Sequence, residues 1–283
     1  MSSSGAPKRR FSAVTNLFRG SGGDLRGDYR QAFENLATAA NAARACEARL
    51  TVAVDKRDED YFRDLVGRDW PDVGVKVLPG DNGFPRIADI LDAAGPEEER
   101  LPDRDYIVYM NADINVPYYF FDHADLNLNI LPAGSALVIN RKDLLDETAC
   151  ITAGMVHEAA KMHVGFDCFV FPRQAYGKFR LGDCVIGRPP IGALLMTNLL
   201  HLVPQVSLLH DSLITWHAGD GSRSSWMDET ARQEVDENFV SAFRALDALI
   251  LDCFPGQDEI QVKTMTHSKV LIDRYISWKS ENP

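Results

Sequence analysis

The sequence lacks both a basic surface stripe and a long apolar run. Its 283 residues carry 30 Lys and Arg against 41 Asp and Glu, a formal net charge of −11. The only basic cluster that stands out, residues 8–10, is too small to predict a nucleic-acid-binding surface. No run of about 18 apolar residues predicts a membrane span, and residues 1–11 lack the apolar stretch of a secretory signal. We therefore expect neither a nucleic-acid partner nor a membrane span.

Cysteines are few, and their number and spacing argue against disulfide bonds and a Cys-x-x-Cys site. The count of five is odd, and no two form a Cys-x-x-Cys pair. This usage is typical of reduced thiols and indicates a cytoplasmic protein. A catalytic cysteine is not expected, because none has an evident histidine partner. The five are Cys46, Cys150, Cys168, Cys184 and Cys253.

Apolar strands alternate with helical patterns through the first 116 residues. Asp28 is a candidate N-cap for the first helix. Such alternation predicts an α/β fold with a mostly parallel sheet covered by helices. The predicted strands of this half are Phe11–Phe18, Leu50–Asp55, Val73–Leu78 and Tyr106–Met110.

The second half is less regular. Helical spacing from Met227 onward predicts a helical C-terminal extension, residues 227–283, packed on the same domain. Residues 1–10 are expected to form a flexible tail, 11–116 a nucleotide-binding half and 117–226 an acceptor half. The predicted strands here are Ser135–Leu144, Phe166–Phe171 and Gln205–His217, the last with a possible break.

A carboxylate follows the buried strand in "YIVYMNADINV". In open parallel sheets, ligands bind beyond the carboxyl ends of the strands, and both Asp55 and Asp113 lie at such ends. A divalent cation that bridges two phosphates needs one or two carboxylates. Asn111, two residues earlier, would share the face of Asp113 in an extended chain. The alternative, that Asp113 is only a turn residue, stays open.

These residues resemble a known family. The first strand and its loop, then "FPRIADIL", then the apolar strand closing on Asn-Ala-Asp-Ile, are similar to GT-A-type nucleotide-diphospho-sugar glycosyltransferases. The resemblance continues in "GFDCFVFPR", "LGDCVIGRPPIG" and "TWHAGDGSRSSW" and covers roughly residues 11–226. It implies a GT-A-like (Rossmann-like) catalytic domain. The implied reaction is sugar transfer from a nucleotide-sugar donor to a small-molecule or glycan acceptor, assisted by Mn²⁺ or Mg²⁺.

The resemblance also implies roles for individual residues. Asp113 would bind the metal, with His217 as a second ligand. Independently of the resemblance, Asp167 in its predicted strand is the first candidate for a catalytic base and Asp183 the second. The alternatives, a structural hydrogen bond for Asp167 and a turn for Asp183, stay open. Arg188 and Asp220 are expected to lie beside the acceptor or in a lid over the site. Donor contacts are implied for Asn16, Arg19, Asp55, Arg86, Asn111 and Asp113.

Among the histidines, His217 is favoured over His210. The two have opposite parity in a continuous strand and would face opposite sides. His217 also precedes "AGDGS", a flexible turn that can act as a lid. His163 and the remaining histidines have no distinctive context.

The chain departs from the family pattern at two places. Asn111 replaces the first Asp of Asp-x-Asp, and Ile191-Gly192 stands where many relatives carry Trp-Asp. The first change is consistent with a non-catalytic nucleotide-sugar-binding protein. A sugar-phosphate nucleotidyltransferase is a further alternative, but residues 16–28 lack its Gly-rich signature. Inverting and retaining chemistry both stay open.

Overall fold

Two sheets organise the chain in a computed structural model, which describes residues 7–20, 22–79, 84–95, 103–144, 160–163, 165–210, 214–218, 229–255 and 269–282. The larger sheet has seven strands in the order β10-β6-β9-β4-β1-β2-β3. All neighbours are parallel except β9, which runs antiparallel to β4 and β6. The strands are β1 (Arg10–Leu17), β2 (Glu47–Val54), β3 (Gly74–Val77), β4 (Asp105–Met110), β6 (Ala136–Ile139), β9 (Cys168–Pro172) and β10 (Val206–Leu209).

The central strands are apolar on both faces. Every residue of β1 and β4 is buried. In β4, Ile107 and Tyr109 join the apolar cluster on one face, whereas Tyr106 and Val108 join the cluster on the other. Successive side chains of a strand point to opposite faces, so helices must cover both sides. The predicted α/β class with a mostly parallel sheet is confirmed.

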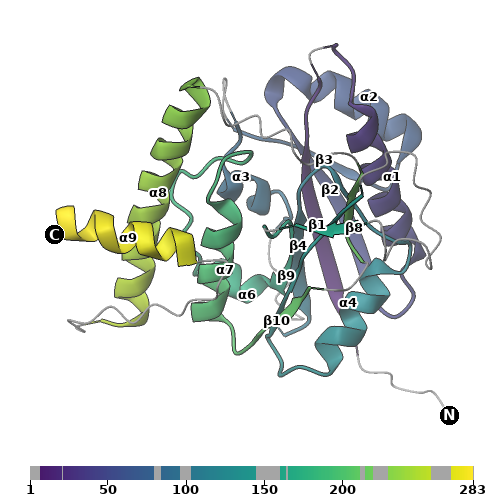
Figure 1. The fold of residues 1–283 in the computed structure, drawn as a ribbon. Coiled ribbons are helices and arrows are strands. Elements are labelled where there is room, and N and C mark those ends of the chain that lie inside the picture. Colours follow the sequence, from purple (N-terminus) through teal and green to yellow (C-terminus); the bar gives the residue numbers. More distant parts are fainter. Residues whose placement is uncertain are drawn as a thin grey trace.

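Helices form a layer on each face of the large sheet (Figure 1). One layer holds α1 (Gly27–Ala42), α2 (Glu59–Asp69) and α4 (Phe120–Asn129). The other holds α3 (Ile87–Asp92), α6 (Arg173–Tyr176) and α7 (Ile191–Leu202), and α8 (Glu229–Cys253) and α9 (Lys269–Glu281) pack outside them. A short 3-10 helix, η1 (Lys56–Asp58), precedes α2. Within the described residues, no helix is long and apolar enough to cross a membrane.

The smaller sheet has four short strands in the order β5-β11-β7-β8. They are β5 (Ile114–Asn115), β7 (Lys142–Leu144), β8 (Ala160–Met162) and β11 (Trp216–Ala218). Each lies next in sequence to a strand of the large sheet: β5 follows β4, β7 follows β6, β11 follows β10, and β8 precedes β9. Because β6 of the large sheet follows β5, the described strands, taken in chain order, change sheet five times.

These crossings correct two sequence predictions. Ser135–Leu144 is not one strand, because the chain leaves the large sheet at Asn140 and enters the small sheet at Lys142. Asn140 N donates to Leu209 O (3.1 Å) on the large-sheet side, and Lys142 N donates to Thr215 O (3.1 Å) on the small-sheet side. Gln205–His217 divides into β10 and β11, so the possible break predicted in this strand is present. The parity argument that separated His210 from His217 therefore does not apply.

Two smaller corrections concern the N-terminal region. Arg9 and Arg10, predicted to lie in a flexible tail, are buried, because Asp125 and Asp105 supply partners for their charges. Asp28 is not the N-cap of α1. The helix begins at Gly27, and the Asp28 carboxylate accepts from Tyr29 N at 3.0 Å inside the first turn.

Candidate active site

The site begins at a tight turn between β4 and β5. Asn111 N donates to Asp167 O (3.1 Å), which extends the pairing of β4 with β9 by one residue. Ile114 N then donates to Asn111 O (3.2 Å) and closes the turn that carries Asp113. The chain here is turned, not extended as predicted, yet it places Asn111 and Asp113 at the same carboxyl edge of the large sheet.

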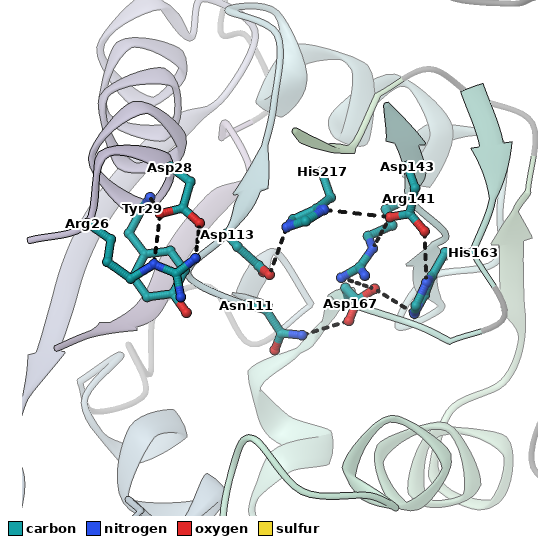
Figure 2. Close-up of polar contacts among 10 residues, drawn as sticks. All are labelled: Arg26, Asp28, Tyr29, Asn111, Asp113, Arg141, Asp143, His163, Asp167 and His217. Carbon is teal, nitrogen blue, oxygen red and sulfur yellow. Dashed lines mark hydrogen bonds and ion pairs between the residues drawn. The ribbon is translucent and has the colours of Figure 1, made fainter. Parts of the chain in front are cut away.

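The small sheet aligns four side chains from different parts of the chain. β11 lies between β5 and β7, and its residue His217 is paired in register with Ile114 on one side and Asp143 on the other. His217 Nε2 lies 3.4 Å from Asp113 Oδ2, and His217 Nδ1 lies 3.8 Å from Asp143 Oδ1. His163, just after β8, places Nδ1 3.2 Å from Asp143 Oδ2. Figure 2 shows His217 between the two carboxylates.

Asp167 and Arg141 close this row into a ring. Asn111 Nδ2 donates to Asp167 Oδ1 (2.6 Å), and Asp167 Oδ2 lies 3.7 Å from His163 Nε2. Arg141 spans the interior, with Nε 2.9 Å from Asp143 Oδ1 and Nη1 3.1 Å from Asp167 Oδ2 (Figure 2). We call this set the polar ring. Its members are Asn111, Asp113, Arg141, Asp143, His163, Asp167 and His217.

The ring shifts the pKa values of two carboxyl groups in opposite directions. Burial raises the pKa of Asp167, and the charges of Arg141 and His163 offset this only in part. Burial also acts to raise the pKa of Asp143, but the hydrogen bond with His163 and the charge of Arg141 outweigh it and lower that pKa. Asp143 is therefore held ionised, and Asp167 is the more basic carboxylate.

The first turn of α1 lies beside Asp113. Arg26 and Asp28 form an ion pair (Nη2–Oδ2 2.6 Å), and the Arg26 guanidinium stacks over the ring of Tyr29, 4.7 Å from its centroid. Burial and the negative charge of Asp113 both raise the pKa of Tyr29. An arginine and a tyrosine hydroxyl thus border the Asp113 side of the ring (Figure 2).

Three more of the predicted donor residues lie at the ends of β1 and β2, on the same edge as Asn111. Asn16 is buried one residue before the end of β1. Asp55 follows β2 and caps η1, where Arg57 pairs with it (2.9 Å) and, through its hydrogen bonds, lowers its pKa. Arg19 pairs with Asp58 (2.7 Å). The carboxyl ends of β2, β1 and β4 therefore form one polar edge.

The other predicted residues lie apart from the polar ring. Arg86 pairs with Asp89 (2.8 Å) and Asp183 (3.2 Å) at the start of α3, and the Asp183 side chain is 84% exposed. Arg188 is nearly buried, pairs with Glu234 of α8 (2.5 Å) and stacks over Phe84 (4.4 Å). Asp220 lies outside the described residues.

Three members of the ring were missed in the sequence. Arg141 and Asp143 lie in "NRKD", which follows the apolar run of β6 as "NAD" follows β4. That repeated pattern, polar residues directly after a buried strand, is the signal that could have identified them. His163 was judged ordinary, because its partners Asp143 and Asp167 become visible only when β8 pairs with β7.

Asp113 and His217 fit a divalent cation as two protein ligands. Their facing atoms are 3.4 Å apart, close to the separation of about 3 Å between neighbouring ligands of an octahedral ion with bonds of about 2.1 Å. Within the described residues, no group of three or more His, Cys, Asp or Glu is arranged to hold a metal. The remaining ligand positions would fall to phosphate oxygens and water.

Comparison with solved structures identifies the fold. Residues 1–349 of TarS from S. aureus, solved with UDP-GlcNAc, match with a TM-score of 0.58 and 12% identity, over 94% of this chain and 71% of that chain. No protein-family model matches the chain, and no curated protein matches it. The chain has the GT-A-like fold of nucleotide-diphospho-sugar transferases, as the resemblance implied.

Two further solved structures match with lower TM-scores. Mannosyltransferase PcManGT from Pyrobaculum calidifontis, in complex with GDP-Man and Mn²⁺, matches with a TM-score of 0.47 and 9% identity, over 98% of this chain and 84% of that one. Inositol-1-phosphate CTP transferase from T. maritima matches with a TM-score of 0.43 and 13% identity, over 82% of this chain and 97% of that one.

Proposed function

We propose that the protein is a glycosyltransferase that takes a sugar from a nucleotide-diphosphate donor and passes it to an acceptor hydroxyl. The observation that carries this is the meeting of Asp113 and His217 at 3.4 Å. They come from distant parts of the chain and meet beside the carboxyl end of β4, the edge where open α/β sheets bind ligands.

The donor fits along the polar edge formed by β2, β1 and β4. Asn16 and Asp55 lie at the strand ends on the nucleoside side, and Asn111 and Asp113 lie on the diphosphate side. Arg26, with its side chain 55% exposed, can donate charge-assisted hydrogen bonds to phosphate oxygens. Asp113 and His217 would hold Mn²⁺ or Mg²⁺. When bound, such an ion neutralises the charge that develops on the leaving diphosphate.

Asp167 occupies the acceptor side of the ring. For inverting transfer, we propose that it removes the proton of the acceptor hydroxyl, because its raised pKa makes it a stronger base than a surface aspartate. Asn111 donates to its Oδ1 (2.6 Å) and fixes the orientation of the carboxylate. The amide at position 111 thus positions Asp167 instead of adding a second metal carboxylate. A retaining enzyme would not need this base.

Binding of UDP-GlcNAc and GDP-mannose, each with Mn²⁺ and with EDTA, tests the donor site. A ligand at about 100 times its Kd adds about 2.7 kcal/mol of stability, which a thermal-shift assay detects. Asp113→Asn and His217→Ala should lose Mn²⁺-dependent affinity at least about tenfold, or about 1.4 kcal/mol. Asp69→Asn, in an ion pair at the end of α2, is the control and should bind as the wild type does.

Turnover separates the proposal from its rivals. A transferase should release nucleoside diphosphate slowly from the donor even without an acceptor. A protein that binds the donor but never releases the diphosphate is a binding protein. Pyrophosphate release from a nucleoside triphosphate and a sugar 1-phosphate would identify a nucleotidyltransferase. Equal Mn²⁺-dependent affinity in the wild type, Asp113→Asn and His217→Ala would rule out the proposed donor site.

A further inference from the structure

The second nitrogen of His217 has no role in the function proposed above. Nε2 faces Asp113, but Nδ1 is buried and receives no hydrogen bond from any described residue. A buried polar nitrogen without a partner costs about 1–3 kcal/mol of stability. This cost would fall if a neighbouring group formed a hydrogen bond with Nδ1. The nearest carboxylate oxygen that faces it is Asp143 Oδ1, at 3.8 Å.

Strand register, not a flexible side chain, places Asp143 there. β11 and β7 are parallel neighbours, and His217 and Asp143 are direct partners in their register. Residues paired across adjacent strands point to the same face of the sheet. The sheet backbone therefore holds the carboxylate beside the imidazole. A shortening of about 1 Å brings Nδ1 and Oδ1 to hydrogen-bond distance.

Two further groups fix the Asp143 carboxylate. Its Oδ2 lies 3.2 Å from His163 Nδ1, and its Oδ1 accepts from Arg141 Nε at 2.9 Å. Each carboxylate oxygen can accept more than one hydrogen bond, so Oδ1 can serve Arg141 and His217 together. Without a cation, Asp113 at 3.4 Å favours the proton on Nε2. With a cation between Asp113 and Nε2, the Nε2 lone pair would be used by the metal, and the Asp143 carboxylate would favour the proton on Nδ1.

We propose that Asp143 is a positioning residue for His217. It accepts the Nδ1 proton in a hydrogen bond and so holds the ring with Nε2 turned toward Asp113, ready for a divalent cation bound between them. This inference rests on the proposed donor site. A carboxylate behind a ligating histidine typically changes metal affinity by about 10–100-fold, because it fixes both the tautomer and the angle of the ring.

Manganese binding tests the inference without relying on turnover. Electron paramagnetic resonance measures unbound Mn²⁺ in titrations of the protein with Mn²⁺ alone and with added UDP or GDP. Asp143→Ala should weaken Mn²⁺ binding by about 10–100-fold. Asp143→Asn should lose less, because its amide oxygen can still accept the Nδ1 proton. The matched control is again Asp69→Asn, which should bind as the wild type does.

The outcomes separate this inference from the proposed function. If His217→Ala loses Mn²⁺ and Asp143→Ala keeps wild-type affinity, the positioning role is wrong and the donor site stands. If Asp113→Asn and His217→Ala both bind as the wild type does, or if the wild type binds no Mn²⁺, both are wrong. Equal losses in Asp143→Ala and Asp143→Asn would also reject the role assigned to the acceptor oxygen.

A measurement on the unaltered protein does not depend on whether the variants fold. Two-bond ¹H–¹⁵N correlation spectra of histidine-labelled protein report which ring nitrogen carries the proton. With Mg²⁺ and UDP present, we expect His217 to carry its proton on Nδ1. A wild-type His217 protonated at Nε2 under these conditions would overturn the inference.

Discussion

The two ends of β4 carry buried charges, but the two clusters differ in how completely they are paired. At the start of the strand, the Asp105 carboxylate lies between Arg10 (2.8 Å) and Arg173 (2.9 Å). Arg173 also donates to the carbonyl oxygens of Ala94 and Gly95. In the polar ring beyond the other end, His217 Nδ1 and Asp167 Oδ2 are buried without a hydrogen bond from a described residue.

Charge balance differs between the two ends as well. Among the described residues, the Asp105 carboxylate pairs with two guanidinium groups, and Arg173 also donates to two backbone carbonyls. The polar ring sets Arg141 against three carboxylates, those of Asp113, Asp143 and Asp167, together with two histidines. A cluster whose charges are balanced stabilises the fold, whereas buried atoms without a hydrogen bond and excess negative charge favour binding of a cationic ligand.

The largest effect that we expect concerns the ring. Asp167→Asn should lower turnover by about 10²–10⁴-fold, the usual cost of losing a general base. Donor binding should change much less, because Asp113 and His217 remain. Steady-state kinetics beside calorimetric donor binding measure the two effects. If turnover stays within a few-fold of the wild type, Asp167 has a structural role and this end of β4 resembles the other.

At the start of β4 we expect the reverse result. Asp105→Asn leaves Arg10 and Arg173 buried without their carboxylate, and breaking such a buried ion pair costs about 3–5 kcal/mol. Urea unfolding measures this loss. Mn²⁺-dependent nucleotide binding, measured at a temperature where the variant is still folded, should be unchanged. A loss below about 1 kcal/mol would contradict the structural role of this cluster.

Hydrogen exchange sharpens the comparison between the two sheets. β1 has 8 residues, all buried, whereas β7 and β11 have 3 each. Amides of β1 and β4 should exchange only through global unfolding, and those of β7 and β11 through local opening. We expect exchange at least about 100-fold faster in the small sheet, measured by mass spectrometry of peptides. Equal protection would mean that the two sheets open as one unit.

Asp183→Asn should give the smallest effect. Its side chain is 84% exposed and pairs with Arg86 outside the ring, and exposed ion pairs contribute about 0–1 kcal/mol. We expect turnover within about twofold of the wild type and a similarly small change in unfolding free energy. The turnover of this variant and that of Asp167→Asn compare the two carboxylates that the sequence predicts as candidate bases. A large loss of turnover would instead place Asp183 at the acceptor.

The sequence predicts the large sheet better than the small one, for a physical reason. β1, β2 and β4 are long and apolar enough to show the pattern of buried strands. The strands of the small sheet have 2 or 3 residues, which is too few for any periodicity to appear. β7 also begins only three residues after the last residue of β6, so Ser135–Leu144 looks like one strand.

The same limit applies to the site. Asp113 was found because it follows a long buried strand, and His217 because its motif resembled a family pattern. The structure brings these two together, while their roles stay predictions. His163 gave no local signal, since its partner Asp143 lies on another strand. Asp143 does follow a buried strand, but its contacts with His163 and His217 arise only when β7 pairs with β8 and β11.

The register of the small sheet limits how the chain can change in length. Because side chains alternate along a strand, one residue inserted within β11 would turn His217 to the opposite face and away from both Asp113 and Asp143. The same insertion in the connection between β10 and β11 would leave the pairing intact. Among descendants of this chain that keep the site, insertions and deletions should gather in the connections and avoid the three residues of β11.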